Sequence, residues 1–81
     1  MKITVKVKKK EEKDVFIATE NIPLDKALKF SGIAGTGGQA KILVQDGLVK
    51  VNGEICFSRG KKLTENDSFE FKNVIYNIKR K

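Results

Sequence analysis

Basic side chains gather in the middle of this chain, and the chemistry they offer is the binding of anions. Between residues 26 and 62, seven basic side chains stand against only two acidic ones, a net charge of +5. The seven cations are Lys26, Lys29, Lys41, Lys50, Arg59, Lys61 and Lys62. Ordinary solvated surface charge explains any single lysine, whereas cations that converge in space would form a basic face for a polyanion.

A glycine-rich segment at residues 32–38 offers a second candidate site. It does not match a nucleotide-binding loop, because a Walker loop needs Lys and Ser or Thr after its last glycine. The backbone N–H groups of Gly37, Gly38 and Gln39, at the start of a predicted helix, would make a small anion site. The glycines also fit a simpler role in a sharp turn, and the two interpretations are compatible.

The residues that usually perform catalysis are missing from the sequence. The chain has no histidine, which removes the usual general base and the commonest zinc ligand. Its single cysteine, Cys56, has no partner for an internal disulfide and is typical of a small buried side chain. We therefore expect no enzyme activity, no metal and no cofactor.

Length and overall charge further restrict the class of protein to which this chain can belong. The 81 residues are expected to form a single domain, 1–81, because two cores of half this size would not be stable. The formal net charge is +7, from 17 basic and 10 acidic residues. Apolar runs such as residues 42–44 are far shorter than the roughly 20 residues that span a bilayer. We expect a cytoplasmic protein that does not contact membranes.

The N-terminal residues 1–20 are predicted to form a β-hairpin. Residues 3–7 alternate between apolar and polar side chains, which is the period of a strand. A polar turn is expected at residues 9–13, and a second strand at residues 14–19.

Two short helices are predicted to follow. The first is expected to begin at Pro23, which suits the first turn of a helix, and to stop at Gly32. The second begins at Thr36, which forms a capping box with Gln39, and ends before Gly47.

The C-terminal half is predicted to be a set of strands. The pair Asn52-Gly53 stands between residues that favour strands and predicts a two-residue type I′ turn. A basic loop at residues 58–62, a strand around residues 69–71 and a last strand at residues 74–78 complete the pattern.

These segments together resemble a known family. Residues 23–29, 36–41 and 43–53 are similar to the S4 RNA-binding domain, the αL module named after a small-subunit ribosomal protein. Residues 35–41 and 59–63 are similar to the stand-alone YaaA/YbcJ group within that family.

The resemblance implies an α+β fold, with two helices packed on a small, mostly antiparallel sheet. It covers about residues 22–72, which would form the αL core. Residues 1–20 would then be an added N-terminal β-hairpin, and residues 73–81 a C-terminal strand with a basic tail.

The resemblance also implies, by position, which residues contact RNA. They lie on the two helices, in the loop between them and in the hairpin: Lys26, Lys29, Thr36, Gly37, Gly38, Gln39, Lys41, Gln45, Lys50 and Asn52. Many family members have arginines where Pro23 and Gly37 stand here, and we expect that charge to be supplied instead by Lys41, Arg59, Lys61 and Lys62.

The leading hypothesis is a non-enzymatic, monomeric module that grips the phosphate backbone of structured ribosomal or transfer RNA, with the ribosome as its setting. The alternative is a protein-interaction module of the same fold that docks through its sheet or its N-terminal hairpin. Most aromatic residues fall in strand or core patterns, which disfavours a base-stacking sheet. Phe30, at the border between the lysine face and the core stripe, is the residue we single out for stacking.

Overall fold

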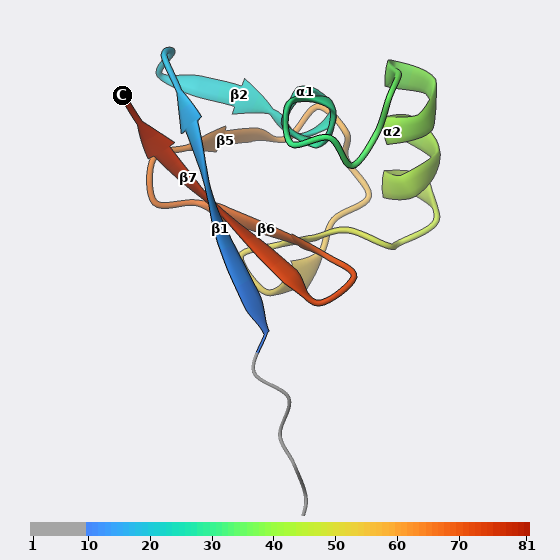
Figure 1. Cartoon of the computed structure of the whole chain (residues 1–81). Helices are drawn as coiled ribbons and strands as arrows, with labels where there is room; N and C mark the ends of the chain where they lie inside the picture. Colours follow the sequence, from blue (N-terminus) through green and yellow to red (C-terminus); the bar gives the residue numbers. More distant parts are fainter. Residues whose placement is uncertain (1–9) are drawn as a thin grey trace, which may run out of the picture.

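The computed structural model describes residues 10–81 and contains two helices beside a five-stranded sheet (Figure 1). In chain order the elements are β1 (Glu11–Ile17), β2 (Asn21–Pro23), α1 (Leu24–Phe30), α2 (Gly37–Gln45), β3 (Lys50–Val51), β4 (Glu54–Ile55), β5 (Lys62–Thr64), β6 (Ser68–Phe71) and β7 (Val74–Arg80). The predicted α+β class, with two helices and a small sheet, is confirmed.

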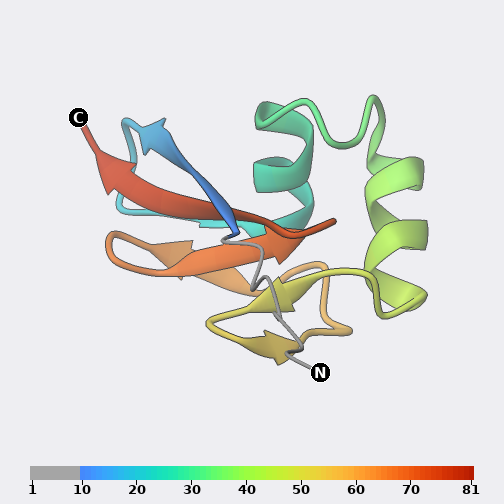
Figure 2. The same cartoon turned by 60° about the horizontal axis from the view of Figure 1, so that its bottom comes forward.

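Most strand pairs in the described residues are antiparallel, as predicted. The strands of the larger sheet follow the order β1-β7-β6-β3-β4, and β2 pairs with β5 in a separate two-stranded sheet. The exception is β1, which runs parallel to β7, with Glu11 opposite Val74 and Ile17 opposite Arg80. The two helices lie side by side at one end of this arrangement (Figure 2).

The N-terminal prediction needs a correction. Glu11–Lys13, which we expected in a turn, belong to β1, because they continue the parallel pairing with β7. The strand predicted for residues 3–7 lies outside the described residues. The short strand β2 was not predicted, since three residues are too few to show an alternating pattern.

The orientation of the first helix follows from the spacing of its apolar residues. Leu24, Ala27 and Leu28 are fully buried and lie on one side of α1, whereas Lys26 and Lys29 are exposed. Pro23, expected in the first turn, instead stands just before the helix as the last residue of β2.

The second helix begins as its sequence predicts. The Thr36 hydroxyl accepts a hydrogen bond from the backbone N–H of Gln39, at 3.1 Å. The Gln39 side-chain oxygen accepts from the backbone N–H of Gly35 at 2.8 Å, one residue earlier than in a standard capping box. At the other end, Gly47 has a φ of 72°, a conformation that glycine adopts without strain.

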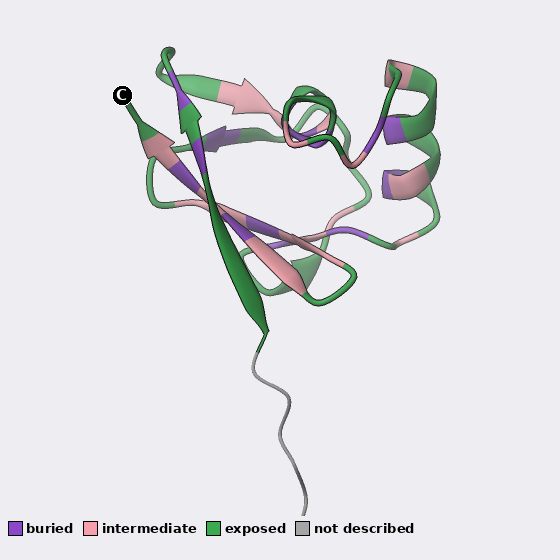
Figure 3. Ribbon diagram, viewed as in Figure 1, coloured by how far each residue is buried: buried purple, intermediate pink, exposed green. Residues whose placement is uncertain are grey.

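One hydrophobic cluster lies between the helices and the sheet, where Figure 3 shows the buried positions. Leu28 of α1 and Val44 of α2 share it with Phe69 and Tyr76, whose rings stack 4.9 Å apart. β1 adds Val15 and Ile17. Because these contributions come from both ends of the chain, the helices and the outer strands are held by the same core.

Two pairs of neighbouring strands in the larger sheet are connected by two-residue turns. Asn52 and Gly53 have φ values of 51° and 89°, which confirms the type I′ turn predicted between β3 and β4. Lys72 and Asn73 adopt the same left-handed conformation between β6 and β7, with φ values of 49° and 65°.

Candidate nucleic-acid interface

The basic loop at residues 58–62 is fastened to the start of α1. The backbone N–H of Leu24 donates to the carbonyl of Lys61 at 2.8 Å, and that of Asp25 donates to the carbonyl of Arg59 at 2.9 Å. Lys62 belongs to β5, where it stands opposite Pro23. These bonds satisfy the first two free N–H groups of α1, which has no side-chain cap. They also bring Arg59, Lys61 and Lys62 beside the first turn of α1.

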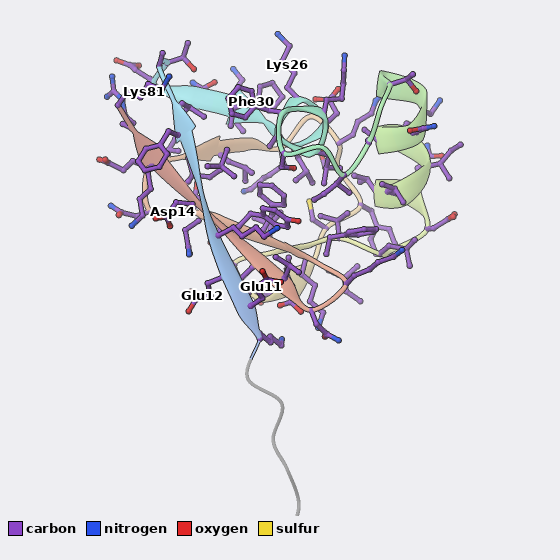
Figure 4. All side chains as sticks on the ribbon, viewed as in Figure 1. Glu11, Glu12, Asp14, Lys26, Phe30 and Lys81 are labelled. Atoms are coloured by element: carbon purple, nitrogen blue, oxygen red, sulfur yellow. The ribbon has the colours of Figure 1, made fainter. Side chains whose placement is uncertain are left out.

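The exposed side of α1 continues this group of cations. Lys26 and Lys29 are both exposed, and Lys26 projects away from the body of the molecule in Figure 4. Together with Ile22 and Phe30 they line a shallow hollow of about 370 Å³. We call the five cations Lys26, Lys29, Arg59, Lys61 and Lys62 the basic cluster.

The start of α2 presents open backbone. No described residue accepts a hydrogen bond from the N–H groups of Gly37 and Gly38. Neither glycine has a positive φ. A methyl group added at Gly37 would meet nothing within 4 Å, and one at Gly38 would make only an ordinary contact with Thr36 at 3.8 Å. The fold therefore does not require glycine at either position, and what the two glycines leave is bare N–H groups open to an incoming group.

Lys41 and Gln45 lie on the exposed part of α2. No hydrogen bond or ion pair within the described chain connects either side chain to the basic cluster. They are joined to it only through the packing of α2 on α1.

Lys50 lies elsewhere. It precedes the buried Val51 in β3, so strand alternation turns its side chain to the sheet face opposite the core. Its neighbour across the strands is Glu70, so the structure does not bring Lys50 together with the basic cluster.

Asn52 is occupied within the protein. Its side-chain N–H donates to the Asp67 carboxylate at 3.2 Å, and its side-chain oxygen accepts from the backbone N–H of Ser68 at 3.0 Å. Asp67 also accepts from the backbone N–H of Thr64 at 2.8 Å. This bond, helped by the Asn52 and Thr64 side chains and by the charge of Lys61, lowers the pKa of the Asp67 carboxyl against the opposing effect of burial. Asn52 thus ties two turns together, and its side chain is engaged within the protein.

The basic cluster has no acidic partner in the part of the chain that the structure describes. Over residues 10–81 there is one ion pair within 4.0 Å, between Lys10 and Glu70 at 3.0 Å. The nearest carboxylate in sequence, that of Asp25, accepts a hydrogen bond from the backbone N–H of Lys26 instead. No ion pair within 4.0 Å therefore occupies the cations of the cluster there, although the charge of Lys61 also acts on the Asp67 carboxyl.

Two exposed aromatic side chains were missed by the sequence patterns. Phe16 is 49% exposed and Phe57 is 67% exposed, although both lie in apolar stretches that predict burial. Phe30, which we singled out, is 65% exposed. Strand alternation gives the signal for Phe16, since its neighbours Val15 and Ile17 are the buried ones.

Residues 10–81 contain neither a cluster of metal ligands nor a helix that could span a membrane. No group of three or more carboxylate or thiol side chains lies close enough to hold a metal ion. None of the helices there has the length and apolar character needed to cross a membrane.

Comparison with known families agrees with this geometry. The family described as S4 domain matches residues 15–79, so the match includes the end of β1, most of β7, both helices and the hairpin. This chain belongs to the S4 domain family. S4 domains are in general RNA-binding modules rather than catalytic domains, which supports an RNA-binding role. A search of curated proteins found no match.

Proposed function

We propose that this protein grips the phosphate backbone of a structured RNA, ribosomal or transfer RNA, through the basic cluster and the start of α2. The observation that carries the proposal is the attachment of the 58–62 loop to α1 by the two hydrogen bonds from Leu24 and Asp25. This attachment sets three loop cations beside two helical ones, and no acidic side chain of the described residues pairs with any of the five.

Two kinds of donor are available to phosphates on this side of the molecule. The ammonium and guanidinium groups supply long-range attraction, and the N–H groups of Gly37 and Gly38 supply short, directed hydrogen bonds at the positive end of α2. Backbone recognition of this kind suits a folded RNA, where shape and phosphates dominate. We expect Lys41 and Gln45 to extend the contact along α2.

Lys50 lies apart from the other proposed RNA contacts. Its position on the opposite sheet face separates it from the basic cluster. Lys41 is exposed on α2 and remains a proposed RNA contact. The charge-reversal variant described below tests it directly. We further propose that the protein acts as a monomer in the cytoplasm, with the ribosome as its setting.

Reversal of charge at two positions tests the proposal. We expect Lys29→Glu combined with Lys41→Glu to lower the affinity for a structured RNA by more than about tenfold, because two attractive contacts become repulsive. The matched control is Lys72→Glu combined with Lys79→Glu, which changes the net charge equally on β7 and the turn before it. Affinity is measured by fluorescence anisotropy at fixed salt, and folding is checked by circular dichroism.

The outcomes separate the candidates. An equal loss in both double variants would mean that net charge alone drives binding, against the proposed face. Undiminished RNA binding in the first double variant, with loss of a protein partner, would favour the protein-interaction alternative.

A further inference from the structure

Phe30 stands between two hollows on the surface. On one side, Phe30 shares the 370 Å³ hollow with Ile22, Lys26 and Lys29. On the other side it shares a second hollow, of about 330 Å³, with residues from three elements. The lining of that second hollow includes Lys13, Asp14, Phe16 and Lys81.

The position of Phe30 explains its exposure. It is the last residue of α1, and it falls outside the buried stripe formed by Leu24, Ala27 and Leu28. Figure 4 shows it on the side of α1 that is turned away from α2, toward the end of the chain at Lys81. About two thirds of the side chain is open to solvent, and Phe16 from β1 lines the same second hollow with about half of its surface open.

The charges around these rings are mainly positive. Lys26 and Lys29 border Phe30 on one side, and Lys13 and Lys81 line the hollow on the other. Asp14 is the one acidic side chain that lines either hollow. Exposed aromatic rings with cations on both sides suit a nucleotide, because the base stacks on the ring while the cations meet the phosphates before and after it.

An apolar protein segment would fit this surface less well. Its backbone and side chains would leave four ammonium groups without anionic partners. Two of these groups, those of Lys26 and Lys29, also belong to the basic cluster, so the stacking surface continues the proposed RNA contact.

We propose that an unpaired nucleobase at the edge of the bound RNA stacks on Phe30, with Phe16 closing the hollow behind it. The phosphates on either side of this base meet Lys26 and Lys29 in one direction and Lys13 and Lys81 in the other. The inference rests on the proposed RNA-binding function and adds a preference: RNA in which a helix adjoins a single strand is bound more tightly than a blunt helix.

The test compares two RNA probes. One is a blunt stem-loop, and the other is the same stem-loop with a short single-stranded extension that carries 2-aminopurine, a base whose fluorescence falls on stacking. We expect the extension to raise affinity about tenfold, the usual contribution of one stacked base. We also expect binding to quench the 2-aminopurine.

Three variants test whether the aromatic ring of Phe30 is responsible for these effects. Phe30→Leu keeps an apolar side chain of similar reach but removes the aromatic face, so the gain from the extension and the quenching should both disappear. Phe30→Trp should keep them. Phe57→Leu is the matched control, because Phe57 is equally exposed but lines a separate hollow with Ile55 and Cys56.

The results for the two probes distinguish a failure of base stacking on Phe30 from a failure of the proposed RNA-binding function. If Phe30→Leu retains the gain and the quenching, base stacking on Phe30 is wrong, even where the blunt stem-loop still binds through the basic cluster. If neither probe binds to the unaltered protein, the proposed RNA function itself fails. If Phe57→Leu removes the gain as fully as Phe30→Leu, the stacked base lies elsewhere on the surface and the assignment to Phe30 is overturned.

Discussion

Lys10 and Lys26 carry the same charge in different surroundings. On the sheet side, Lys10 pairs with Glu70 at 3.0 Å, and the side chain of Asn77 donates to Glu12 at 3.3 Å. On the helix side, Lys26 has no acidic partner within the described residues. Figure 4 shows the contrast in position, with Lys26 projecting beyond α1 and Glu11 and Glu12 on the distant part of β1.

The difference separates charges that serve the fold from charges left for a partner. The paired charges of Lys10 and Glu70 satisfy one another and add little attraction for an outside anion. Unpaired cations repel one another in the free protein, and that repulsion is relieved when phosphates arrive. Among the described residues, Lys50, Lys79 and Arg80 on the sheet also lack an ion pair, so the basic cluster is distinguished by the placement of its cations around the first turn of α1.

The salt dependence of binding is the most sensitive probe of this comparison. If about four cations each neutralise a phosphate, the affinity for RNA should fall about 50- to 150-fold between 50 and 200 mM salt. The free energy of unfolding should change by less than about 1 kcal/mol over the same range, because the ion pair on the sheet is partly exposed. Titrations of RNA and urea at matched salt concentrations measure both. A flat affinity would contradict the assignment of unpaired cations to RNA.

A second prediction concerns Asp67, whose charge serves the fold. The pKa of its carboxyl is lowered in the folded state, chiefly by the Thr64 N–H. Its stabilising effect is therefore fully present above the pKa of the unfolded chain, near 3.8, and is lost as the pH falls through the lower folded value. Asp67→Asn should destabilise the protein by about 1–2 kcal/mol at pH 7 and leave RNA affinity unchanged.

The difference between Asp67→Asn and the unaltered protein should shrink as the pH falls below 3.8 and through the lower folded-state pKa of Asp67, because the carboxyl then becomes neutral like the amide. Urea unfolding at several pH values measures it. Glu65→Gln is the control, since Glu65 makes no side-chain hydrogen bond with another described residue. A difference that persists at low pH would mean that the charge of Asp67 is not what stabilises the turn.

The smallest expected effect is that of Gly37→Ala, which should stabilise the fold but weaken RNA binding. Gly37→Ala should raise stability by a few tenths of a kcal/mol to about 1 kcal/mol, because alanine favours a helix and the added methyl meets nothing. The same methyl should lower RNA affinity severalfold by holding a phosphate away from the backbone N–H groups. Thermal melting and anisotropy measure the two effects.

Gly53→Ala gives the contrasting control. Its φ of 89° makes any side chain strained, so this variant should lose stability. If Gly37→Ala leaves RNA affinity unchanged, the open backbone of α2 does not contact the RNA.

Features that depend on a few neighbouring residues were predictable. The cap at Thr36, the turn at Asn52-Gly53 and the left-handed Gly47 each arise from local backbone preferences, and the structure shows all three. The buried stripe of α1 follows from helical spacing in the same way. The resemblance in these segments was also sufficient to indicate the family.

What the sequence determined by itself, then, was the set of elements and the residues that cap, turn and line them, because those choices are made within a few peptide units. The tertiary structure decided which distant segments meet: β1 runs parallel to β7, the carbonyls of Arg59 and Lys61 fasten to α1, and Lys50 lies on the far side of the sheet. Such placements depend on pairings between residues tens of positions apart, which no local pattern encodes. The same long-range packing determines which cations remain unpaired.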